Sequence, residues 1–262
     1  MGPYYLICFY VLSAIFGLCV GSFLNVVIYR VPENMSLAKP NSHCPRCKYE
    51  LRWYDNIPVL SYIMLGGKCR NCKTHISFRY TAVELANMAL WLLSAFLFAE
   101  KSIPMAVICA LVSSVFICIF FIDLEHQLIF DRFQIILLAL GIVYVFFDKD
   151  FGWISHLIGG AAGFLTFYLI SWGFEKLSGR EGLGGGDVKL AGAAGLLLGW
   201  ERLLLSMLVA TIPAAIIMLF ATRGKEGEER QFPFAPFLVI GFSVAMFFGT
   251  EIIDLYLSLL GV

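Results

Sequence analysis

Charged residues are scarce in this 262-residue chain: they make up 15% of it, against about a quarter in an average soluble domain. Lys and Arg balance Asp and Glu at 19 each, so the basic excess that favours nucleic acid is missing and no nucleic-acid partner is expected. No Lys or Arg precedes Arg30, which argues against a cleaved signal peptide with a basic n-region. The HExxH signature of many zinc proteases is absent as well.

What the chain has instead is apolar residues, which make up 60% of it and gather in long runs. Crossing a bilayer takes roughly 20 such residues in a helix. We therefore expect an all-α integral membrane protein with about eight transmembrane helices, embedded in the lipid bilayer and keeping its first apolar run as a span. The candidate spans are 4–29, 81–98, 104–122, 133–147, 151–174, 188–200, 203–222 and 233–260, of which 133–147 and 188–200 are short.

The basic residues predict how these spans are oriented, because Lys and Arg concentrate in cytoplasmic loops. Sixteen of the 19 lie in alternate loops, and only three lie in the loops between them. The Lys- and Arg-rich side is therefore expected to face the cytoplasm, with the N-terminus outside. The expected organisation is a first transmembrane helix at 1–29, a small cytoplasmic insert at 30–80 and a transmembrane domain at 81–262.

The insert contains two CxxC pairs separated by 21 residues. This spacing suits a tetrahedral zinc site, and a reduced cytoplasm disfavours stable disulfides. Disulfides, free thiols, or His43 or His75 in place of one thiolate are the alternatives. About 50 residues bury little core, so we expect structural zinc whose binding supplies folding energy. The four expected ligands are Cys44, Cys47, Cys69 and Cys72.

Two aspartates stand where apolar runs meet the expected cytoplasmic side. Asp123 ends the third candidate span, and Asp187 opens the sixth, directly after the glycines of GLGGG. Ionisable groups at membrane depth are costly and usually functional. Two carboxylates close together in a poorly hydrated site can share a proton, so that one acts as base on a water and the other donates to a carbonyl oxygen. This is the chemistry of an aspartic protease.

Other roles fit the spacing alone. Asp187 could simply cap a helix, and Asp123 could mark a membrane boundary. A transporter could use both as a proton relay, although it would favour charges nearer the bilayer midplane. A zinc-stabilised membrane scaffold would need only the insert and would tolerate loss of both aspartates.

Further residues near these aspartates are candidates for substrate binding. Glycines let a backbone approach a bound peptide strand closely, and acidic side chains after the third span could hold a basic peptide. The candidates are Gly184, Gly185, Gly186, Glu125 and Asp131.

Several segments, taken together and in order, match one known family. They are GSFLNVVIYR (21–30), CPRC and CRNC, WYDNIPVLSY (53–62), FIDLEHQLIFD (121–131), GLGGGDVKL (182–190) and FPFAPFL (232–238). The set resembles the type IV prepilin peptidases, which are membrane aspartic proteases with a GxGD motif. Phe130 stands where the family often has Pro, and Leu183 where it often has Met; both differences bear on subsite preference.

The resemblance implies a bifunctional enzyme of the bacterial inner membrane. It would remove the short basic leader from type IV prepilins and pseudopilins at the cytoplasmic face, cutting after Gly, with Asp123 and Asp187 as catalytic residues. It would then N-methylate the new N-terminal residue using S-adenosylmethionine, an activity that accompanies the four-cysteine loop. No soluble methyltransferase motif is present, so the expected cofactor-binding residues are Gly21, Ser22, Asn25 and Glu84.

Overall fold

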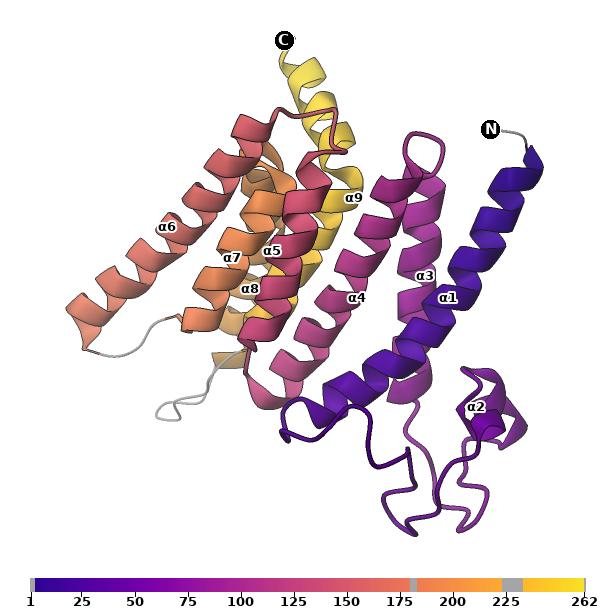
Figure 1. The fold of residues 1–262 in the computed structure, drawn as a ribbon. Coiled ribbons are helices and arrows are strands. Elements are labelled where there is room, and N and C mark those ends of the chain that lie inside the picture. Colours follow the sequence, from indigo (N-terminus) through magenta and orange to yellow (C-terminus); the bar gives the residue numbers. More distant parts are fainter. Residues whose placement is uncertain (1–2, 180–182, 223–232, 262) are drawn as a thin grey trace. The chain divides into compact units, whose positions relative to one another are not determined.

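The computed structural model describes residues 3–179, 183–222 and 233–261. These residues are helical apart from loops and two single-residue antiparallel bridges in the insert. Eight long helices are described, and each overlaps one of the apolar runs (Figure 1). They are α1 (Pro3–Arg30), α3 (Arg79–Phe98), α4 (Ile103–His126), α5 (Asp131–Val145), α6 (Trp153–Ser178), α7 (Gly185–Leu198), α8 (Trp200–Thr222) and α9 (Ala235–Leu260). The insert adds a 3₁₀ turn, η1 (Trp53–Asn56), and a short helix, α2 (Leu60–Met64).

Six of the described helices are long and apolar enough to cross a membrane: α1, α3, α4, α6, α8 and α9. The all-helical membrane fold is thus confirmed. The helices α5 and α7 have 15 and 14 residues. At 1.5 Å per residue they are about 21–23 Å long, shorter than the ~30 Å hydrocarbon core. The expectation of eight spans therefore stays a prediction.

The chain divides within α4 into two compact units, residues 1–118 and 119–262. In the first unit α1 packs along α3, and glycines allow the two backbones to approach. A methyl group on Gly17 would lie 2.8 Å from Met88 Cα, and one on Gly21 would lie 2.8 Å from Glu84 Cα. Such small-residue contacts are how membrane helices pack closely.

A chain of hydrogen bonds ties the first unit together across three helices. The Asn87 side chain donates to the Gly17 carbonyl oxygen at 2.7 Å and accepts from the Ser114 hydroxyl at 2.8 Å. That hydroxyl in turn accepts from the Trp91 indole N–H at 2.9 Å. These buried polar groups satisfy one another, as groups in hydrocarbon must.

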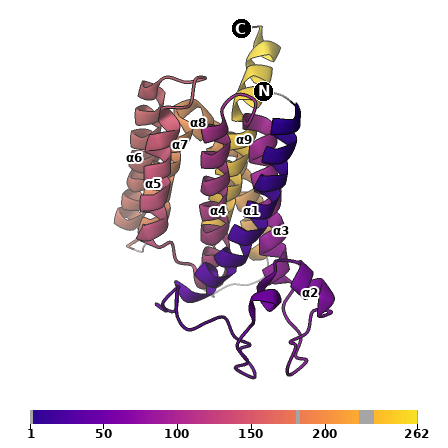
Figure 2. The ribbon, with the colours of Figure 1, turned by 45° about the vertical axis from the view of Figure 1, so that its right-hand side comes forward.

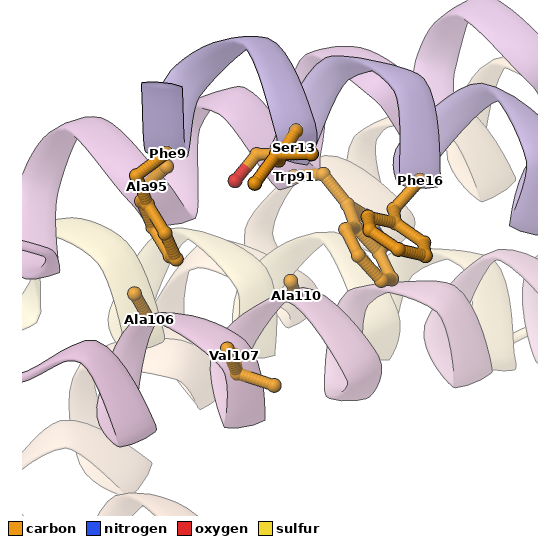
Figure 3. A pocket seen from close by; sticks show the side chains of 9 residues that line it. Phe9, Ser13, Phe16, Trp91, Ala95, Ala106, Val107 and Ala110 are labelled. Carbon is orange, nitrogen blue, oxygen red and sulfur yellow. The ribbon is translucent and has the colours of Figure 1, made fainter. Parts of the chain in front are cut away.

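An apolar cavity of about 280 Å³ lies between α1, α3 and the first half of α4 (Figure 3). Phe9, Phe16 and Trp91 line it together with Ala110, and Ser13 is the one polar side chain in its wall. A charged amino-acid cofactor needs several polar partners. This cavity is therefore not a fit for S-adenosylmethionine.

In the second unit the short helix α7 is the buried element. It packs against α5 and α6, and α8 packs against α9 (Figures 1 and 2). A methyl group on Gly159 of α6 would collide with the Gly195 carbonyl oxygen of α7, and one on Gly163 would collide with that of Ala191. Burial in protein rather than lipid explains why α7 can be shorter than a membrane is thick.

A buried ion cluster lies at the end of α7. The Arg202 guanidinium, 2% exposed, bonds to the Asp148 carboxylate at 2.5 Å and to the Tyr144 hydroxyl at 2.8 Å. The Nδ1 atom of His156 donates to the Leu196 carbonyl oxygen at 3.0 Å. Removing Arg202 or Asp148 alone would leave the other charge buried without its partner, at a cost of about 3–5 kcal/mol.

Two glycines of α6 provide a matched test of this packing. Gly159→Ala should destabilise the protein by about 1–3 kcal/mol, because the methyl group forces α6 away from α7. Gly173→Ala meets nothing within 4 Å and should be neutral or slightly stabilising, because Ala favours helix. Thermal unfolding in detergent compares them, and equal melting temperatures would contradict the packing described.

Candidate active site and metal centre

Asp123 lies in the last turns of α4 and is 6% exposed. Its carboxylate accepts a hydrogen bond from the backbone N–H of Ala235, the first residue of α9. Pro236 occupies the first turn of that helix, a position that Pro favours because no N–H is lost there. The N-terminus of α9 thus directs the Ala235 N–H and the partial positive charge of the helix at Asp123.

Asp187 lies in the first turn of α7, whose N-cap is Gly184. Its backbone N–H bonds to the Gly184 carbonyl oxygen at 3.0 Å. Asp123 is near enough for its charge to act on Asp187. The structure therefore brings together the two carboxylates that the sequence singled out.

Each of these carboxylates has one buried oxygen without a hydrogen-bond partner among the described residues: Asp123 Oδ2 and Asp187 Oδ1. Leaving a buried acceptor unpaired costs about 1–3 kcal/mol, and more if it is charged. Native proteins rarely tolerate this except where chemistry or an unseen water or ligand accounts for it. The pair is therefore suited to hold a water and a reacting carbonyl group.

The three glycines before Asp187 differ in their surroundings. A methyl group on Gly186 would lie 2.9 Å from Ile129 Cβ, so packing in this unit requires glycine there. A methyl group on Gly185 would meet nothing within 4 Å, and one on Gly184 would meet only Asp187 Oδ2 at 3.5 Å. Packing among the described residues gives no reason for glycine at 184 or 185.

Side chains of α5 bond to α7 on both sides of Asp187, at Gly186 and at Lys189. The Gln134 amide, 3% exposed, donates to the Gly186 carbonyl oxygen at 3.0 Å. One turn further along α7, the Lys189 ammonium pairs with Asp131 at 2.7 Å. The sequence analysis did not predict a role for Gln134, although a single amide inside an apolar run indicates a polar partner elsewhere in the fold.

The two acidic candidates for substrate binding occupy different positions. Asp131 already has Lys189 as a partner, and both side chains are more than half exposed. Glu125 is exposed in the last turn of α4, two residues after Asp123. Glu125 thus shares α4 with Asp123, and Asp131 begins α5, which packs against the helix that carries Asp187, α7.

The four residues proposed for the cofactor gather in the first unit. Gly21 packs on the backbone of Glu84, and the Ser22 side chain is hydrogen-bonded to the Glu84 carboxylate. The Asn25 amide donates to the carbonyl oxygens of Tyr80 at 3.0 Å and Gly21 at 3.4 Å. Its Oδ1 atom is buried without a partner among the described residues. This acceptor and the Glu84 carboxylate fit a cationic, amine-bearing ligand.

The four cysteines of the insert form one cluster whose Sγ atoms lie within 4.8 Å of one another. The Sγ atoms of Cys44 and Cys72 are 3.8 Å apart, and those of Cys47 and Cys69 are 3.9 Å apart. Zn–S bonds of about 2.3 Å at tetrahedral angles require S–S separations of about 3.8 Å. The geometry therefore fits a four-thiolate zinc site.

The two CxxC pairs are built alike. Cys44 N–H bonds to the Tyr49 carbonyl oxygen at 2.9 Å, and Cys69 N–H bonds to that of Thr74 at 2.8 Å. A hydrogen bond from the Thr74 side chain, the first of several hydrogen bonds to this thiol, lowers the pKa of Cys72 to about 6. This thiol is thus largely a thiolate at neutral pH, which is the form that binds metal.

These features define a class: a helical membrane protein with a pair of aspartates at helix ends, each with one buried oxygen, and a four-cysteine insert. The chain belongs to the type IV leader peptidase family. The model of that family matches residues 109–219, and the model of the bacterial peptidase A24 N-terminal domain matches residues 15–98. With its apolar helices, the chain is a multi-pass protein of the inner membrane.

Curated relatives cover most of the chain, and three of them carry the name "Prepilin leader peptidase/N-methyltransferase". The protein of Burkholderia pseudomallei (strain 1026b) is 36% identical over 91% of this chain and 85% of its own length. That of Pseudomonas aeruginosa is 34% identical over 97% and 95%, and that of Myxococcus xanthus is 38% identical over 88% and 68%. No solved structure matches the chain.

The hydrogen bond from Gln134 to Gly186 predicts that Gln134 positions the adjacent Asp187. Gln134→Leu removes the donor and should lower kcat for leader cleavage about tenfold to a hundredfold, because a small displacement of Asp187 is costly, with KM little changed. Gln134→Glu can donate only when protonated, so its kcat relative to the parent should rise as pH falls. A pH-independent ratio, or a change in KM alone, would contradict this role.

The thiolate cluster predicts about one zinc ion per chain. Cys69→Ser should lose the metal, because a weak hydroxyl ligand replaces a thiolate. Cys8→Ser changes an exposed thiol of α1 and should keep the metal. Mass-spectrometric metal analysis of both purified chains is the measurement, and full zinc content in Cys69→Ser would refute the ligand assignment.

Proposed function

We propose that this chain is a prepilin leader peptidase that also methylates the N-terminus it exposes. One observation carries the peptidase part: Asp123 is near enough for its charge to act on Asp187, and each carboxylate has a buried oxygen without a partner among the described residues. Family membership and the names of the relatives agree with this reading.

The proposed reaction needs the two carboxylates in different protonation states. The ionised one takes a proton from a water, whose oxygen attacks the carbonyl carbon of the scissile peptide bond. The protonated one donates to the carbonyl oxygen as the tetrahedral intermediate forms. When the C–N bond breaks, the proton taken from water passes to the leaving amine. The two protonation states belong to the pair as a whole, so either residue can be the base and the other the acid.

Substrate binding is proposed to use the glycines before Asp187. Gly184 and Gly185 leave space that packing among the described residues does not need, so an extended peptide backbone can lie against them. Gly186 is held by Ile129 and Gln134, which keeps Asp187 in place. Glu125 and Asp131 supply negative charge for the basic leader. Asp131 would release Lys189 and pair with a basic residue of the leader instead. The cut falls after Gly, before the apolar helix of the prepilin or pseudopilin.

The methylation step is assigned to the first unit. Gly21, Ser22, Asn25 and Glu84 would hold S-adenosylmethionine, which supplies the methyl group. The Glu84 carboxylate and the Asn25 Oδ1 atom, which has no partner in the described part of the chain, suit its positive charge and its amine. Zinc is proposed to be structural.

The proposed topology follows the basic residues. The N-terminus is outside, eight helices cross the membrane, and the insert and the aspartate pair face the cytoplasm, where a prepilin leader lies. The proposed division is a first span at 1–29, the zinc insert at 30–80 and the peptidase domain at 81–262.

Single amide substitutions test the carboxylate pair. Asp123→Asn and Asp187→Asn should each lower cleavage of a type IV prepilin at least about a thousandfold, because neither amide can exchange the proton. Asp254→Asn, at an exposed site on α9, is the control and should cleave normally. The mass of the prepilin's N-terminal peptide after incubation with S-adenosylmethionine reports leader loss and the added methyl group together.

Normal cleavage by either amide variant would remove that residue from the mechanism. Both variants should still methylate a pilin whose leader has already been removed, which shows that they are folded. Loss of the leader without methylation in the parent chain would leave the peptidase and refute the second activity.

A further inference from the structure

The short helix α2 presents three large apolar side chains to the outside of the insert. Leu60, Ile63 and Met64 are 57%, 66% and 82% exposed. Residues spaced by three and four positions share one face of a helix, so the three form a single apolar face. We call these three residues the α2 face. Within a membrane span, lipid would cover such exposed apolar side chains, but the α2 face lies outside the candidate spans.

The other side of α2 is fixed to the protein. Tyr62, on the opposite side of the helix, contacts the ring of Phe78 edge to face, with the centroids 6.2 Å apart. The Val59 N–H, directly before α2, donates to the Glu84 carboxylate at 2.8 Å. These contacts orient the helix and leave the α2 face turned away from the insert.

The contact with Glu84 also fixes the depth of α2. Glu84 lies five residues into α3 from Arg79, which is about 7.5 Å along the helix axis. The short helix therefore begins beside the first turns of a membrane-spanning helix. Figures 1 and 2 show α2 next to the end of α3 from which the insert extends.

Charge adds a second argument. The insert at 30–80 has nine basic residues against three acidic ones, and Asp55 is already paired with Arg70 at 2.7 Å. A basic segment with an apolar face is the composition of an interfacial anchor on anionic lipid. Both ends of the insert continue into spans, α1 and α3, so a lipid surface is always within reach.

We propose that the α2 face is an interfacial membrane anchor that lies at the boundary of headgroups and acyl chains in an anionic bilayer. The lipid surface covers the apolar side chains, and the exposed basic residues of the insert, which exclude the buried Arg30, contact its phosphates. The anchor fixes the height of the zinc insert at the membrane. This role does not depend on leader cleavage or on which membrane face the insert occupies.

Photocrosslinking of the full chain tests this proposal. Benzoylphenylalanine replaces Ile63 or Met64, and the protein is placed in nanodiscs of phosphatidylglycerol and phosphatidylcholine. Phe96, a 70% exposed residue of α3, is the site expected to label with lipid. Asn71, exposed between the second pair of cysteines, is the site expected not to.

Intact-mass analysis should find lipid adducts at 63 and 64 with yields close to that at 96, and at least about tenfold above that at 71. Adducts to a second copy of the chain, or none while position 96 is labelled, would overturn the proposal. In discs of phosphatidylcholine alone the yield at 64 should fall severalfold, and an unchanged yield would refute the role given to the basic residues. Zinc content of each labelled chain shows whether the insert is folded.

Discussion

The position of α7 is the constraint on which the second unit depends, because this helix carries Asp187 and has too few residues to be fixed by lipid. Side chains bond to its carbonyl oxygens near both ends: Gln134 to Gly186, and His156 to Leu196. Between these points its backbone touches that of α6 at glycines. A helix held in this way cannot slide or rotate without breaking these hydrogen bonds, so Asp187 has a defined place relative to Asp123.

The same arrangement accounts for the buried charges far from the aspartate pair. Arg202 and Asp148 are stabilised by each other and by Tyr144, and this cluster closes the end of the unit at which α7 stops. At the other end, the positively charged partners of the aspartates among the described residues are helix N-termini. The N-terminus of α9 faces Asp123, and Asp187 itself lies in the first turn of α7. A Lys or Arg beside the pair would favour the ionised form of both carboxylates, whereas the proposed mechanism needs one of them protonated.

The sequence predicted the elements whose signal is local. The apolar runs located all eight long helices, the CxxC spacing located four thiols that fit zinc, and the position of the aspartates at the edges of runs brought them to one site. It did not predict Gln134, Arg202 or the role of Ala235, because each acts on a partner 50 or more residues away. In a run of apolar residues such a polar side chain stands out, but its partner is decided only by tertiary packing.

The insert shows how a segment without a core can still be ordered. Few of its residues are buried, and among them only Val31, Cys44 and Cys69 are apolar, so hydrophobic burial within it contributes little. A metal would tie the two cysteine pairs together, the Val59–Glu84 hydrogen bond attaches it to α3, and lipid would cover the α2 face. Each contact by itself is weak or local, but they act on different parts of the segment. Together they restrict a loop of about 50 residues at the same membrane surface from which α1 and α3 emerge.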